Sequence, residues 1–338
     1  MDYNDYKNDR ENTENEQPKK KKRGSIFFRS YASDGPGVRE NDVIRIDEYN
    51  VKNLFKLYFR RFRKLVNVNW LYIFGNFPIL FLLLAISGNF SHIAPAPTSQ
   101  YFPVVYGAMT ASGSTPSIAA LLGIHGVGGT VTAYTTVDYI LFGISALFVI
   151  TFGLVNCGCT NILKNVVKGE QLFIWDDFIG AIKQNWKQGI ALGIFDLVVL
   201  ALCGYSIVSY WANYTAYYVL FYCSIAMTAF YLFMRYYMYT MLVTFDISFF
   251  KIIKNSFIFA VLSLGKNLLA LIGAIAFTGV MLALFMLFMP LGIIIFLMFY
   301  VSTVSYITMY ASYPKIKALM IDPYYAADGT PLDGGDGK

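Results

Sequence analysis

The sequence predicts an all-α polytopic membrane protein whose six transmembrane helices form three hairpins. Three stretches, residues 65–163, 188–234 and 267–314, contain none of the chain's 27 Lys and Arg residues. Each stretch holds two long apolar segments and the connection between them. Because basic residues near membrane spans stay on the cytoplasmic side, this pattern predicts an even number of crossings with both termini in the cytoplasm.

Composition supports the same class. The chain is 56% hydrophobic and 14% charged, whereas soluble domains carry roughly a quarter charged residues. Its net charge of +6 does not indicate a nucleic-acid partner, because sixteen of the basic residues lie within positions 1–64. The lipid bilayer is the predicted partner of the apolar segments. The four Cys lie in or beside these segments and give no disulfide framework for an exposed domain.

Two polar tails flank the predicted membrane domain of residues 46–317. Residues 1–45 have too few apolar side chains to form a core and are predicted to be a disordered basic cytoplasmic tail. Their run PKKKKR at 18–23 fits either binding of anionic lipid headgroups or a solvated segment that helps to fix orientation. Residues 318–338 are predicted to be a flexible C-terminal tail. The N-terminus shows no pattern of a cleavable signal peptide.

The six spans follow from apolar runs close to the roughly 20 residues that cross a hydrocarbon core. Pro78 predicts a kink in the first span, and Met289 with Pro290 predicts a tight outward turn between the last two. The predicted spans are residues 68–87, 137–156, 190–210, 216–234, 268–288 and 291–311.

The loop at 88–136 is the one sizeable region predicted outside. It is rich in Gly, Ser, Thr and Pro and has no Lys or Arg. Thr115-Pro116 predicts a helix start and residues 126–129 a break. Loops of this length are either functional or disordered, and a partly ordered cap is expected here.

Similar amphipathic segments precede the hairpins. Residues 177–186 and 248–257 share an aromatic at the second and tenth positions and Ile-Lys at the sixth and seventh, and residues 51–70 occupy the same place before the first span. Such segments predict helices lying in the cytoplasmic interface. The candidate interfacial or partner-docking residues are Trp175, Phe178, Ile182, Trp186, Phe249, Ile253 and Phe257.

Asp196 is the candidate intramembrane functional residue, because a charge inside a span is costly and is by default functional. Proton coupling, a cation site and pairing with a basic group on another helix are all open. The structural alternative is a carboxyl near the inner interface, hydrated or bonded to Tyr or Asn.

The other candidate chemical residues and motifs of the sequence do not indicate an enzyme. His92 and His125 lack the partners of a zinc site. Cys157 and Cys159 form a CxC pair without the rest of a four-ligand set, so they are expected to be buried or interfacial free thiols. Phosphate-loop and serine-hydrolase patterns are absent from the sequence. We therefore expect no catalytic residue, no metal and no cofactor.

Several stretches resemble the YesL-like family, bacterial membrane proteins that carry a domain of unknown function. The resemblance covers about residues 50–315, and this chain departs from the compact members in its long outer loop and basic tail. It implies a bacterial plasma membrane location and an association with carbohydrate ABC uptake. The motifs are NWL at 69–71, NFPI at 76–79, NILKNVVKGE at 161–170, WDDF at 175–178, KQNWKQ at 183–188 and TFDISFFKIIKN at 244–255.

Two function hypotheses follow. In the first, the protein is a non-catalytic accessory of a carbohydrate ABC transporter, whose partners would be the permease subunits or a sugar-binding protein; a homo-oligomer is also open. In the second, it is an autonomous transporter or channel for a small solute, with Asp196 lining the path. A transporter core usually has more intramembrane polar residues and inverted repeats, and the units here share one topology.

Overall fold

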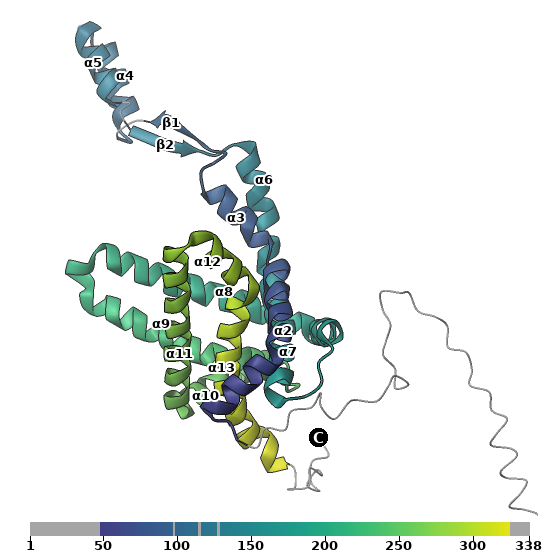
Figure 1. Cartoon of the computed structure of the whole chain (residues 1–338). Helices are drawn as coiled ribbons and strands as arrows, with labels where there is room; N and C mark the ends of the chain where they lie inside the picture. The colour runs from purple at the N-terminus through teal and green to yellow at the C-terminus, as the bar shows by residue number, and fades with distance from the viewer. Residues whose placement is uncertain (1–47, 97–98, 114–115, 127–128, 325–338) are drawn as a thin grey trace, which may run out of the picture. The chain divides into compact units, whose positions relative to one another are not determined.

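The computed structural model describes residues 48–96, 99–113, 116–126 and 129–324 (Figure 1). The predicted basic tail at 1–45 lies outside these residues. The described chain is mostly helical. Its elements are α2 (Val51–Gly75), α3 (Pro78–Ile86), β1 (His92–Ala96), α4 (Phe102–Ala111), α5 (Pro116–Gly126), β2 (Gly129–Ala133), α6 (Thr136–Ser145), α7 (Leu147–Lys168), α8 (Ile174–Ala212), α9 (Tyr214–Leu242), α10 (Phe249–Leu262), α11 (Leu264–Leu287), α12 (Met289–Ile295), the π-helix η2 (Phe296–Tyr300), α13 (Val301–Ile316), the π-helix η3 (Lys317–Ile321) and the 3₁₀ turn η4 (Asp322–Tyr324).

Several of these helices are long and apolar enough to cross a membrane. Five pass by length and composition, and a sixth is gained if α2 and α3, bent by 56° at their junction, are one span. The break falls at Asn76 and Phe77, and Pro78 takes the first position of α3, where a missing N–H removes no helical bond. The predicted multi-pass helical class is therefore confirmed, and the predicted kink falls at Pro78.

The amphipathic segments are built in three different ways. Only α10 is a helix of its own, ending before α11 at Ser263. The segment 177–186 is the first part of α8, which is broken by the non-helical backbone of Asn185 (φ −116°, ψ 18°). The segment 51–70 is continuous with the first span in α2. A separate interfacial helix before each hairpin of spans was expected, and α2 differs because it has no breaker before Asn76.

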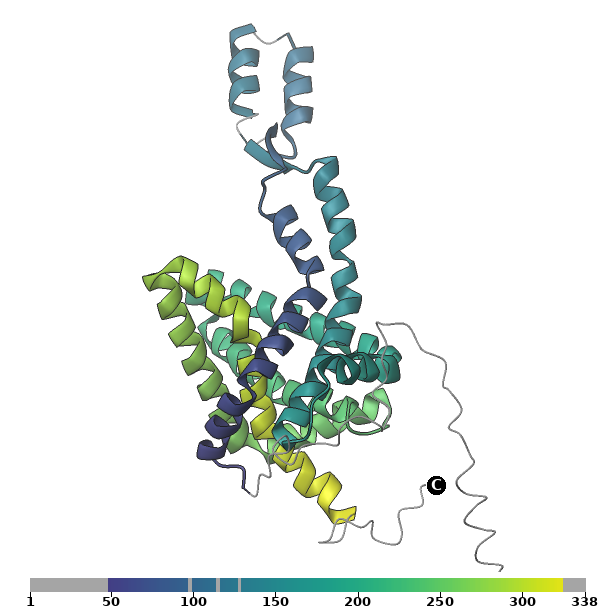
Figure 2. The ribbon, with the colours of Figure 1, turned by 45° about the vertical axis from the view of Figure 1, so that its right-hand side comes forward.

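The loop predicted at 88–136 contains a pair of strands and a helical hairpin. β1 and β2 are antiparallel, with His92 opposite Ala133 and Ala96 opposite Gly129. Between them lie α4 and α5, which contact each other (Figure 2). The helix start predicted at Pro116 is confirmed, whereas the two strands were not expected from the sequence.

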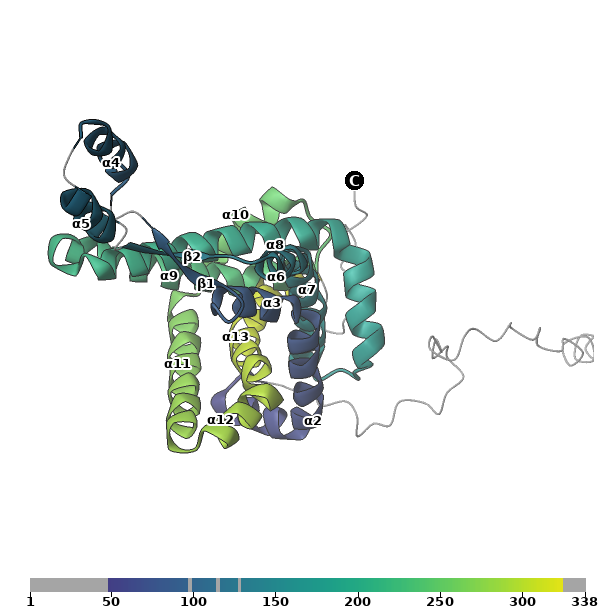
Figure 3. The same ribbon diagram turned by 90° about the horizontal axis from the view of Figure 1, so that it is seen from above.

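The helical core forms where helices distant in the sequence meet. Seen from above, α13 lies between α2 and α11 and contacts both (Figure 3). α7 and α8 cross closely at three glycines: a Cβ on Gly193 would lie 2.4 Å from the Cα of Gly153, and a Cβ on Gly153 would lie 2.1 Å from the carbonyl oxygen of Gly189. Small residues let helix backbones approach in this way in membranes.

Asn69 joins α2 to the irregular part of the last helix. Its fully buried side chain donates to the carbonyl oxygen of Leu297 (2.8 Å) and accepts from the backbone N–H of Ser302 (3.0 Å). A π-helical segment disrupts the regular i to i−4 bonds, so this amide satisfies backbone groups at η2. Beyond α13, helical structure continues to Tyr324, so residues 318–324 of the predicted flexible tail are helical; residues 325–338 lie outside the described part of the chain.

Candidate functional site

Asp196 is fully enclosed in α8 and bonded by three side chains of α9. Tyr231 Oη donates to Oδ1 at 2.8 Å, and Tyr239 Oη donates to Oδ2 at 2.9 Å. Arg235 Nε lies 2.8 Å from Oδ2 and 3.1 Å from Oδ1. Both carboxylate oxygens therefore accept two hydrogen bonds, which is the condition for holding a charge in apolar surroundings.

The spacing along α9 explains how three donors reach one carboxylate. Tyr231, Arg235 and Tyr239 follow one another at intervals of four residues, so they lie on one face of the helix. The guanidinium also packs over the rings of Phe152 and Tyr239, with its central carbon 5.8 and 5.5 Å from their centroids. Its Nη2 lies 3.4 Å from Asn156 Oδ1 on α7. The cluster thus ties α7, α8 and α9 together.

In the sequence, Arg235 and Lys164 indicate only the cytoplasmic side. The structure gives both a role inside the protein. Lys164 is buried, and its Nζ donates at 2.8 Å to the carbonyl oxygen of Val243, which caps the C-terminus of α9. A cation at a helix C-terminus is stabilised by the exposed carbonyls and the helix dipole. The Tyr-x3-Arg-x3-Tyr pattern, next to a span with one carboxylate, was the signal that could have revealed the pairing.

A polar cavity of about 280 Å³ adjoins this cluster. All three predicted hairpin units contribute to it: α2 and α7 from the first, α9 from the second, and α11 and α13 from the third. Arg235 is the one charged side chain among the described residues that line it. The polar residues of the lining are Tyr72, Asn156, Thr160, Arg235, Tyr236, Tyr239, Thr240, Thr278, Ser305 and Thr308.

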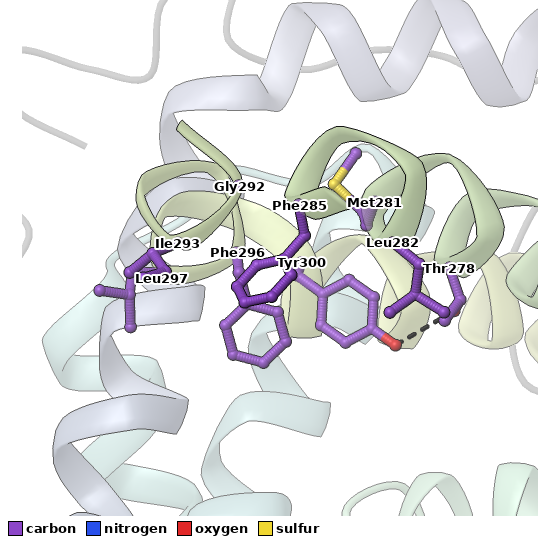
Figure 4. A pocket seen from close by; sticks show the side chains of 9 residues that line it. All are labelled: Thr278, Met281, Leu282, Phe285, Gly292, Ile293, Phe296, Leu297 and Tyr300. Carbon is purple, nitrogen blue, oxygen red and sulfur yellow. Dashed lines mark hydrogen bonds between the residues drawn. The ribbon is translucent and has the colours of Figure 1, made fainter. Parts of the chain in front are cut away.

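A second pocket, of about 350 Å³, is almost wholly apolar and lies between α11 and the α12–η2 segment (Figure 4). Phe285, Phe296 and Leu297 are among its lining residues. Thr278 lines both this pocket and the polar cavity. Its hydroxyl lies 3.1 Å from the hydroxyl of Tyr300, the last residue of the π-helix. This hydrogen-bonded pair therefore stands where the two cavities adjoin.

The candidate docking residues divide into two groups. Trp175, Trp186 and Phe257 are exposed. Phe178, Ile182, Phe249 and Ile253 are half-buried: Phe178 packs on the core that contains α7, and Phe249 lies edge-on to Phe195. Cys157 and Cys159 are buried free thiols, as expected.

Comparison with known proteins gives one partial match. Residues 132–207 match a family described as "Protein of unknown function, DUF624". The matched segment runs from β2 through α6 and α7 into α8, and it includes the glycine crossing and Asp196. No curated protein and no solved structure matches the chain.

Proposed function

We propose that this protein is a non-catalytic accessory of the bacterial plasma membrane, associated with carbohydrate uptake by an ABC transporter and oriented with both termini in the cytoplasm. One observation carries the choice of an accessory over a coupled transporter. Asp196 is fully enclosed, and both its oxygens are saturated by Tyr231, Arg235 and Tyr239. A carboxylate held in this way joins helices, whereas proton or cation coupling requires a group that solvent or solute can reach.

The helical hairpin of α4 and α5 supplies a surface for a partner subunit. No Asp, Glu, Lys or Arg occurs anywhere in residues 65–137. On this hairpin Val104 and Ile124 are 73% and 71% exposed, and α4 has no buried residue. Apolar side chains gathered at an exposed site are typical of interaction surfaces. The partners proposed for it are the permease subunits or a sugar-binding protein.

The test is co-purification of the tagged full-length protein from its native membrane in a gentle detergent. We expect permease subunits in stoichiometric amounts, and loss of them when Val104 and Ile124 are both replaced by Ser. The control is the replacement of Val198 and Val208 by Ser, since these are similarly exposed apolar residues of α8. Recovery of the protein alone, or only with copies of itself, would contradict the accessory role.

A transporter or channel for a small solute is the second candidate, and the polar cavity between the three hairpin units favours it. Cavities between helices are common sites for small ligands. Uptake of labelled solutes into vesicles that contain only this protein would support this function. In that case Arg235 and the hydroxyls of the cavity would line the path, and Asp196 would hold Arg235 in place.

A further inference from the structure

The cavity beside Arg235 offers two kinds of hydrogen-bonding group. Arg235 supplies N–H donors: Asp196 accepts from its Nε, while 28% of its side chain is accessible although Asp196 is completely enclosed. Its Nε faces the carboxylate, and its Nη2 lies 3.4 Å from Asn156 Oδ1 at the cavity wall. Asn156 adds an amide at the same wall.

The hydroxyl of Thr308, on α13, acts mainly as an acceptor. Its hydrogen is donated to the carbonyl oxygen of Ser305 at 2.9 Å. A hydroxyl has a single hydrogen, so the half-buried Thr308 presents lone pairs to the cavity. Such a lining matches ligand groups, such as hydroxyls, that can both donate and accept hydrogen bonds.

The charge of the site determines which class of small solute it can bind. Arg235 is neutralised by Asp196, so the site as a whole carries no net charge. An anion would add an uncompensated charge in apolar surroundings, which is costly, and it would meet the Thr308 oxygen without donating to it. A cation would be repelled by the guanidinium. A neutral solute with several hydroxyls meets neither penalty.

We propose that this cavity binds a small, neutral, polyhydroxylated solute, with the guanidinium of Arg235 donating to its oxygens and the hydroxyl of Thr308 accepting from it. The volume of about 280 Å³ is several times the roughly 30 Å³ that one water occupies in the liquid. It lies just below the range of drug-sized ligand pockets, about 300–1,000 Å³, and this limits the ligand to a small molecule.

The test is equilibrium binding to the full-length protein in lipid nanodiscs, with glycerol, ribitol and D-glucose as neutral probes and inorganic phosphate as the anion. We expect saturable binding of at least one neutral probe, without competition by phosphate. Ser305→Phe, which places a ring in the cavity, should weaken that binding at least tenfold. The matched control is Ser206→Phe, because Ser206 bonds its own helix in α8 and lies outside the lining.

A milder variant covers the case in which Ser305→Phe does not fold. Thr308→Val keeps the shape of the side chain and removes only the oxygen, so it should weaken binding about threefold or more while the melting temperature stays near that of the unmodified protein. Absence of saturable binding by all three neutral probes, binding of phosphate in their place, or unchanged binding in both cavity variants would overturn the proposal. These outcomes are independent of co-purification, so this site and the accessory role can fail separately.

Discussion

Arg235 Nε lies 2.8 Å from Asp196 Oδ2, and this ion pair joins α9 to α8 across 39 residues of sequence. The pair is completed by two tyrosine hydroxyls and by the amide of Asn156. It places a full charge of each sign inside a helical bundle, beside a polar cavity. Its neutrality as a unit explains how both charges are tolerated there.

Asp196→Asn should destabilise the protein strongly, because it leaves the charge of Arg235 without its partner. Removal of one member of a buried pair costs about 3–5 kcal/mol. Thermal unfolding in detergent measures the loss, and Asp196→Asn combined with Arg235→Gln should lose less than the sum of the single variants. Additive losses would contradict a direct coupling of the two residues.

Gly193→Ala should destabilise the crossing of α7 and α8, because the added methyl would lie 2.4 Å from the Cα of Gly153. Overpacking of this kind typically costs about 1–3 kcal/mol. Gly204→Ala in the same helix is the control: nothing lies within 4 Å of its Cβ position, and Ala favours the helix over Gly. Equal melting temperatures for the two variants would show that the crossing is looser than described.

Asn69→Ala should lower stability by leaving the Leu297 carbonyl and the Ser302 N–H without this partner. Each buried polar group left unsatisfied costs about 1–3 kcal/mol. Asn213→Ala is the comparison, since that side chain is exposed and bonds only the Ser209 carbonyl of its own helix. The melting temperature should fall clearly for the first variant and little for the second.

Lys164→Met should destabilise α9 at its C-terminal end, because the charged bond to the Val243 carbonyl is lost. Hydrogen bonds that involve a charged group contribute about 1.5–3 kcal/mol. Lys168→Met removes only the exposed ion pair with Glu170, and such pairs contribute about 0–1 kcal/mol. A similar effect of both substitutions on the melting temperature would count against the capping role of Lys164.

The proposed orientation predicts which introduced thiols face the outside. Cys203 and Cys223 are first replaced by Ser, while the buried Cys157 and Cys159 are kept. Ser112→Cys, at the end of α4, should then react with a membrane-impermeant maleimide in intact cells. Lys254→Cys, exposed on α10, should react only after the membrane is opened. The reverse labelling pattern would contradict the proposed orientation and place both termini outside.

The sequence by itself determined the membrane class, the apolar segments and local breaks such as Pro78 and Pro116, because these depend on hydrophobicity and backbone preferences over a few residues. It also singled out Asp196. Only the tertiary structure decided what Asp196 and Lys164 bond to, that Asn69 satisfies the backbone at the π-helix, and that α2, α7, α9, α11 and α13 share a polar cavity. These relationships join residues from 39 to 233 positions apart, and no periodicity within one segment encodes the distance between two side chains on different helices.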